Sequence, residues 1–165
     1  MPPSKQKIIV QIAQQFDGLN VRRANIEKLV KIVCRRFDLA GATVSIAIVG
    51  DRGFRAVNSR FRGSKSASDC LSFDLSEEGE AYFELVVNGE MAVRQANLRK
   101  HSGEAELALY ITHGLLHNLG FNDATETQAR QMHRTEDEIL QEAGYGAVYS
   151  AGIGEKRRKS KLNGP

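Results

Sequence analysis

The sequence predicts a single α+β domain, because strand-like and helix-like patterns of apolar residues alternate along a chain of 165 residues. A chain of this length suits one domain better than two, and it can bury a core of its own without disulfides. Residues 43–49 alternate as a half-buried strand does, with Val44, Ile46 and Ile48 on one face. Over residues 21–37, apolar side chains recur instead with the period of a helix.

The first half of the chain adds a strand, a turn and a short helix to these elements. Residues 7–13 alternate and are rich in Ile and Val, which predicts a strand. Asn20 can cap the helix that follows it. The Gly-Asp-Arg-Gly sequence at residues 50–53 indicates a turn, and a short helix is expected to follow it through residues 58–61.

The second half predicts two strands and three helices. Apolar runs at residues 70–73 and 82–87 are expected to be strands, and residues 91–100 a helix. Ser102 can cap the next helix, and Thr125 opens the last one with a capping-box sequence.

The composition favours a cytoplasmic protein. No apolar run approaches the roughly 20 residues that cross a bilayer, so no membrane contact is expected. The polar N-terminus lacks the apolar segment of a secretory signal. Cys34 and Cys70 both lie among apolar residues and are expected to be buried rather than catalytic.

The basic residues near the C-terminus form a block without acidic residues: Lys156, Arg157, Arg158, Lys159 and Lys161. Such blocks usually stay disordered. The folded domain is therefore expected to span residues 1–150, and residues 151–165 to form a basic tail. This tail is interpreted either as a solvated end or as an arm that contacts RNA phosphates.

The residues that carry chemistry lie between positions 113 and 123. His113 and His117 are four apart on a predicted helix, so their rings leave the same face and can reach one metal ion. Gly120 permits a sharp turn, after which Asp123 can return beneath the histidines. Two histidines and a carboxylate leave a position open, as catalytic zinc sites require. We predict one metal ion per chain on these three side chains.

Gly114 occupies the position at which zinc peptidases of the His-Glu-x-x-His type carry their glutamate base. The glycine is expected to open room beside the metal. The missing base argues for a substrate other than a peptide, or for a base supplied elsewhere. His101 is expected at the surface or in the cap region of the helix that follows it, and His133 is expected to be partly buried and hydrogen-bonded. A competing interpretation places Asp123 behind the ligands and lets His133 or water complete the site.

Three blocks of the sequence resemble the YbeY family of endoribonucleases, which mature ribosomal RNA. His-Gly-Leu-Leu-His at residues 113–117 matches the family's H-G-x-L-H, and Leu-Gly-Phe at 119–121 continues the match. Residues 58–63, N-S-R-F-R-G, resemble its N-x-x-(Y/F)-R-G, and residues 68–73, S-D-C-L-S-F, its T-D-V-L-S-F. The similarity extends over roughly residues 8–144.

This resemblance implies a mixed four-stranded sheet packed with helices, with the metal-binding motif at the end of a central helix. It implies a zinc-dependent endoribonuclease that cleaves single-stranded ribosomal RNA, with the small ribosomal subunit and its proteins as partners. Arg62 matches the family's functionally important arginine, whose guanidinium fork is suited to the scissile phosphate.

The sequence also departs from the family pattern. The family's final Asp-His is Asn122-Asp123 here, so the third ligand changes from histidine to aspartate and the identity of the metal stays open. Glu84 replaces the aspartate of the family's G-D-I-V-I strand. Asn122 and Glu84 are candidates for substrate binding or for support of the ligands. The alternatives are an RNA-binding assembly factor with a structural metal and, disfavoured by Gly114, a metallopeptidase. No residue stands out as general base, and no feature indicates an oligomeric state.

Overall fold

The computed structural model describes residues 7–61 and 69–150, which form one sheet and the helices packed on it. The strands are β1 Ile9–Gln14, β2 Thr43–Val49, β3 Cys70–Asp74 and β4 Tyr82–Asn88. Their order in the sheet is β1-β2-β4-β3. The pairs β1–β2 and β2–β4 are parallel, whereas β3 runs antiparallel to β4. The predicted mixed four-stranded sheet is confirmed.

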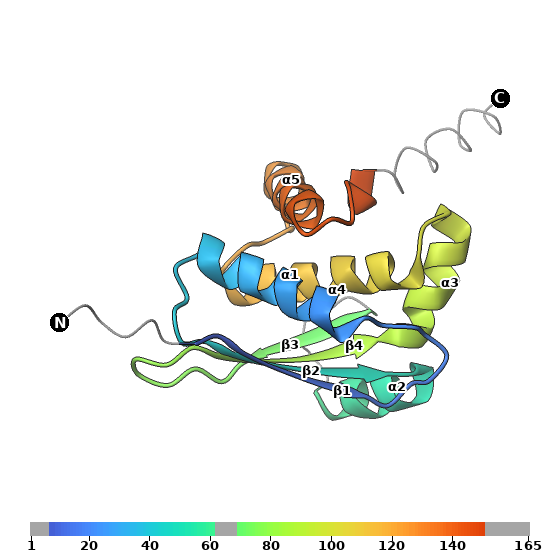
Figure 1. Cartoon of the computed structure of the whole chain (residues 1–165), viewed down its shortest axis with the longest axis horizontal. Helices are drawn as coiled ribbons and strands as arrows, with labels where there is room; N and C mark the ends of the chain where they lie inside the picture. Colours follow the sequence, from blue (N-terminus) through green and yellow to red (C-terminus); the bar gives the residue numbers. More distant parts are fainter. Residues whose placement is uncertain (1–6, 62–68, 151–165) are drawn as a thin grey trace.

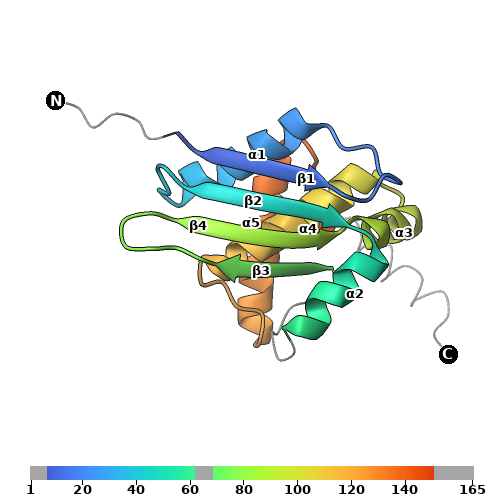
Figure 2. The same ribbon diagram turned by 90° about the horizontal axis from the view of Figure 1, so that it is seen from below.

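The helices form layers on the two faces of the sheet (Figure 1). They are α1 Arg23–Arg36, α2 Asp51–Arg60, α3 Gly89–Arg99, α4 Gly103–Asn118 and α5 Glu126–Glu142. The helices α1 and α4 cover one face, and α5 packs over both of them. The opposite face carries α2 at one end, as Figure 2 shows from below.

The central helix of the fold is α4, which lies between the sheet and α5. It is buried along nearly its whole length, including Leu107, Ile111 and Leu115. Such burial suits a mostly apolar helix, and its buried carboxylates Glu104 and Glu106 are paired with basic side chains. Within the described ranges, no helix is long and apolar enough to cross a membrane.

The start of α1 differs from the sequence prediction, because a long-range contact sets it. The buried carboxylate of Glu104 accepts hydrogen bonds from the Arg22 backbone N–H (2.8 Å), Asn25 Nδ2 (3.2 Å) and the Tyr145 hydroxyl (2.7 Å). Arg22 is held in an extended conformation and becomes the N-cap residue. The predicted Asn20 cap is therefore wrong, and the helix begins at Arg23.

The turn predicted at residues 50–53 is also wrong, because α2 begins directly after β2. The N–H of Asp51 donates to Glu90 Oε1 of α3 (2.9 Å). The Asp51 carboxylate pairs with Arg94 of the same helix at 2.6 Å. These contacts bind the first residue of α2 to α3.

Candidate metal centre

Two histidines near the end of α4 direct their rings to one place. His113 and His117 are four residues apart in a helix that ends at Asn118. Their Nε2 atoms lie 2.9 Å from each other. The side chain of His113 is 17% exposed and that of His117 is 32% exposed, so the pair faces solvent only in part.

The turn after α4 returns a carboxylate to the same place. Gly120 adopts a φ of 93°, a conformation that glycine accepts readily. The Phe121 N–H then donates to the Leu116 carbonyl at 2.9 Å, which closes the turn. The Asn122 side chain accepts hydrogen bonds from the backbone N–H groups of the next two residues at 2.9 and 3.3 Å. This Asx turn fixes the backbone that carries Asp123.

The three side chains fit a divalent metal ion. Asp123 Oδ2 lies 3.8 Å from His113 Nε2 and 3.9 Å from His117 Nε2, and the donor atoms of the group all lie within 4.8 Å of one another. Donor atoms that bind zinc at about 2.0–2.1 Å in a tetrahedron lie roughly 3.3 Å apart. Small movements would therefore bring these atoms to one ion, and the structure joins the residues that the sequence placed together.

Hydrogen bonds behind the cluster orient its rings. His113 Nδ1 lies 3.4 Å from Oε1 of Glu136, a carboxylate of α5 that is 1% exposed. His117 Nδ1 lies 3.2 Å from the Phe121 carbonyl. When each Nδ1 donates to its oxygen, each Nε2 is free to bind a metal. Burial disfavours the charged form of His113, but the hydrogen bond and charge of Glu136, together with the charges of Asp69 and Asp123, outweigh burial and raise the pKa of His113.

The two remaining histidines lie outside this cluster. His133 is partly buried, with Nδ1 at 2.7 Å from Glu136 Oε1, which confirms the expected environment. Its ring stacks on Tyr149 with centroids 3.6 Å apart. His101 lies directly before Ser102, the N-cap residue of α4, which agrees with the expected cap region. It is not a surface residue, since its side chain is only 16% exposed and pairs with the buried Glu106 of α4. A carboxylate buried at that depth needs such a partner.

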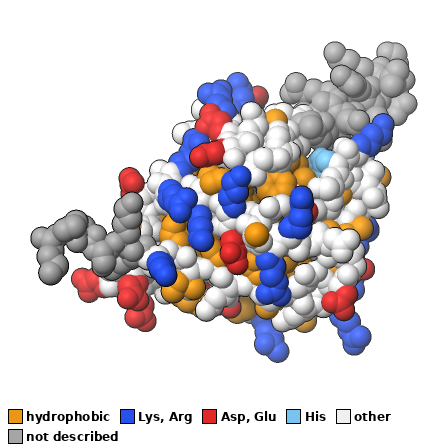
Figure 3. Space-filling model, in the orientation of Figure 1, with side chains coloured by type: hydrophobic (Ala, Val, Ile, Leu, Met, Phe, Trp, Pro, Cys, Tyr) orange, Lys and Arg blue, Asp and Glu red, His pale blue; other side chains and the backbone are white. Residues whose placement is uncertain are grey.

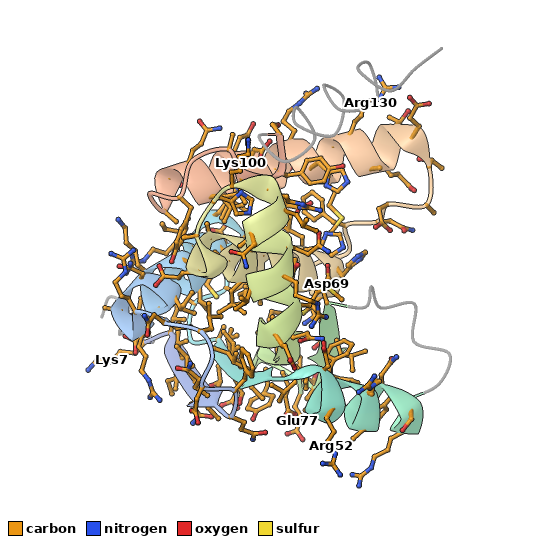
Figure 4. All side chains as sticks on the ribbon, turned by 90° about the vertical axis from the view of Figure 1, so that its right-hand side faces the viewer. Lys7, Arg52, Asp69, Glu77, Lys100 and Arg130 are labelled. Atoms are coloured by element: carbon orange, nitrogen blue, oxygen red, sulfur yellow. The ribbon has the colours of Figure 1, made fainter. Side chains whose placement is uncertain are left out.

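A cavity of about 400 Å³ opens beside the cluster. Its walls include His113, Asp123 and Glu136, together with Asp69, Arg99 and Tyr149. Figure 4 shows Asp69 where β3 begins. Burial raises the pKa of Asp69, whereas the nearby His113 opposes the rise.

Sequence reasoning did not assign Asp69 or Glu136 to the site. Asp69 stands inside the S-D-C-L-S-F block, and Glu136 follows His133 by three residues on the last helix. These sequence positions are the only hints that the sequence offers, and neither indicates that the two carboxylates lie near His113. Both come close to the cluster only through the packing of β3 and α5 around α4.

Gly114 does not open room beside the metal cluster, contrary to the expectation from the sequence. A Cβ atom at this position would lie 2.6 Å from Leu85 Cδ2 and 2.7 Å from Cys70 Sγ. Both neighbours are buried in the sheet. The glycine therefore serves the close approach of α4 to β3 and β4.

The other candidate residues are placed as follows. Glu84 lies in β4 between the core residues Phe83 and Leu85, so strand alternation puts it on the face of the sheet away from α4. It does not line the cavity. Asn122 shapes the turn that carries Asp123. Arg62 and the basic block of the tail lie outside the described residues.

A central helix with two histidines, a carboxylate returned by the following turn and a cavity beside them define a small α+β protein with a candidate metal site. The chain belongs to the YbeY family. The family model described as Endoribonuclease YbeY matches residues 11–144.

Relatives named endoribonuclease YbeY support this assignment. The protein of Anaeromyxobacter sp. (strain Fw109-5) is 41% identical over 108 residues, which are 64% of this chain and 56% of that relative, so the match spans little more than half of the relative. The protein of Bacillus licheniformis is 32% identical over 136 residues, 74% of this chain and 86% of the relative. The solution structure of TM1509 from Thermotoga maritima shares the fold, with a TM-score of 0.51 and 23% identity over 81% of this chain and 91% of that one.

Proposed function

We propose that this chain is a zinc-dependent endoribonuclease that hydrolyses phosphodiester bonds in single-stranded ribosomal RNA during ribosome maturation in the cytoplasm. The observation that carries the proposal is the cluster of His113, His117 and Asp123 beside a cavity, in a chain of a family whose model is described as an endoribonuclease. Ribosomal RNA and the small ribosomal subunit with its proteins are the proposed partners.

The proposed roles follow from the positions of the side chains. His113, His117 and Asp123 would hold the zinc ion, which when bound supplies a Lewis acid for a phosphate oxygen or for water. Glu136 orients the ring of His113 from behind. Arg62 would bind the scissile phosphate through its guanidinium group, a role supported by its match to the family block at residues 58–63.

The basic tail is a second proposed contact with RNA. Figure 3 shows Lys and Arg side chains dispersed among apolar and acidic ones on the described part of one face, without a single large basic patch there. A tail with five basic residues between positions 156 and 161 would add phosphate contacts. A chain cut after residue 150 should stay folded and bind RNA more weakly, with a smaller dependence on salt. An unchanged salt dependence would exclude the tail as a contact.

The experiment that tests the proposal combines metal analysis with a nuclease assay. Purified protein should contain one zinc ion per chain and cleave single-stranded fragments of ribosomal RNA in preference to duplex RNA. His117→Ala should lose both properties, whereas Asp74→Asn, which changes an exposed carboxylate at the far end of β3, should keep both. RNA binding without cleavage would favour an assembly factor with a structural metal, and cleavage of peptides would favour a metallopeptidase.

The role of Arg62 requires its own variant. Arg62→Lys keeps the charge but loses the bidentate fork. The melting temperature should stay near that of the wild type while RNA cleavage falls. A large loss of stability with normal activity per folded molecule would instead assign Arg62 to the fold.

A further inference from the structure

The residue directly before β3 brings a carboxylate to the metal cluster that α4 itself does not supply. Asp69 lines the same cavity as His113 and Asp123. Its backbone is anchored, because its carbonyl accepts the N–H of Asn88 at the end of β4 (2.8 Å). The backbone that carries this carboxylate is therefore held in place beside the cavity.

One oxygen of this carboxylate is left without a partner. Asp69 Oδ1 is buried and accepts no hydrogen bond from any residue that the structure describes. The backbone N–H groups of Asp69 and Cys70 are near the carboxylate and favour its charged form. Buried polar atoms in folded proteins nearly always have a partner, and an exception needs an explanation. Because Asp69 also lines the cavity beside the metal cluster, the candidate for the missing partner is a donor that binds in that cavity.

Packing at Gly114 explains why a strand can provide this group. The absence of a side chain lets Cys70 Sγ and Leu85 Cδ2 occupy the positions that a Cβ atom would contact at 2.7 and 2.6 Å. The first residue of β3 therefore packs directly against α4, one turn before His117, and Asp69 precedes it in the chain. With glycine at position 114, the helix lacks the glutamate of the zinc peptidases. The same glycine lets the start of β3, which Asp69 directly precedes, pack close to α4.

We propose that Asp69 is the general base of the reaction: its carboxylate holds the attacking water and takes its proton. This inference rests on the proposed hydrolysis of a phosphodiester. The water oxygen forms a bond to phosphorus, and the bond between phosphorus and the leaving ribose oxygen breaks. The proton of the water passes to Asp69, and solvent water supplies the proton that the leaving oxygen takes up. Asp69 is thereby a catalytic residue, and Oδ1 acquires its hydrogen-bond donor from the water.

The competing interpretation is electrostatic support of the cluster, in which Asp69 serves only to balance charge beside His113. The two roles predict different losses. A supporting carboxylate would weaken metal binding when it is neutralised, whereas a general base would leave metal binding intact and lower kcat. Neutralisation should not destabilise the metal-free fold if Oδ1 is unpaired there, because no hydrogen bond to that atom is lost.

The experiment compares Asp69→Asn with wild type and with Asp74→Asn, which alters an exposed carboxylate on the same strand. Zinc affinity is measured by competition with a chelator, and the melting temperature of the metal-free protein by circular dichroism. The kcat and KM values are measured with single-stranded ribosomal RNA. Asp69→Asn should lower kcat by at least about a hundredfold, with zinc affinity, KM and melting temperature close to wild type. Asp74→Asn should change none of them.

Several outcomes would overturn the inference. Equal kcat in Asp69→Asn and wild type would show that Asp69 takes no proton. A loss of zinc affinity that parallels the loss of activity would assign it to support of the metal instead. If Asp69→Asn lowers the melting temperature, Asp69→Ala decides: equal kcat per folded molecule in that variant would exclude the base. A wild-type protein that cleaves no RNA would refute the proposed function itself, and the inference with it.

Discussion

Glu136 offers a direct test of how the cluster is held. Glu136→Gln replaces a buried carboxylate by a neutral amide of the same size, so it removes charge while preserving the packing between α4 and α5. In the wild type, Oε1 lies 2.7 Å from His133 Nδ1 and 3.4 Å from His113 Nδ1. A carboxylate behind a metal-binding histidine fixes its tautomer and raises its basicity. The variant should therefore bind zinc more weakly.

The magnitude of this loss follows from the two distances. Removal of such a carboxylate typically weakens metal binding by about 10- to 100-fold. The contact with His113 is long and the oxygen is shared with His133, so we expect the lower part of this range. A weakening of about 10- to 30-fold corresponds to roughly 1.4–2 kcal/mol of binding free energy.

The assay is competition with a chelator of known zinc affinity, with the melting temperature of each metal-free protein as a check on folding. His133→Asn is the matched control, because it removes the shorter hydrogen bond to the same carboxylate and changes none of the three proposed ligands. Zinc affinity should be retained in this control. Equal affinity in Glu136→Gln and wild type, or equal losses in both variants, would refute the assigned orientation of His113.

Three further predictions follow from the structure. Asp123→Ala should weaken zinc binding at least about tenfold, while His133→Ala should not; the reverse result would make His133 the ligand. Burial alone would raise the pKa of Glu104, but the hydrogen bonds that its carboxylate accepts lower this pKa in the folded protein. The ionised carboxylate therefore stabilises the fold fully above about pH 4.3, the pKa of an unfolded glutamate. This stabilisation is lost as the pH falls through the lower pKa of the folded state. Glu104→Gln should remove this acid-dependent part and lower unfolding free energy at pH 7 by about 1–3 kcal/mol, measured by urea unfolding from pH 3 to 7. Gly114→Ala should destabilise the fold by about 1–3 kcal/mol through overpacking, reduced by about 0.5–1 kcal/mol because alanine has the better helix propensity. A variant as stable as the wild type would show that the neighbouring side chains of the sheet move aside without an energetic cost.

The sequence predicted the sheet well because each strand has one face in the core. The strand predicted at residues 43–49 matches β2 residue for residue, and β4 extends the prediction by one residue. The errors lie where a distant side chain determines the backbone. Glu104 fixes the start of α1, and Glu90 binds the first N–H group of α2. Local patterns contain no information on these contacts.

The same distinction holds for the candidate site. His113, His117 and Asp123 were predictable because one helix and one turn bring them together. Asp69 and Glu136 were not, since each reaches the cavity from an element that packs against α4. A sequence shows which residues share a helix face, but it does not show which strand or helix will cover that face.

The packing at Gly114 also limits the evolutionary paths open to this site. A single substitution to glutamate would recreate the His-Glu-x-x-His pattern of zinc peptidases in the sequence. In this fold, the new side chain would have to enter the space that Cys70 and Leu85 fill. The glutamate would therefore require these two side chains, or the helix and the sheet that carry them, to move. The two kinds of site differ by one residue in sequence, but the packing between α4 and the sheet separates them.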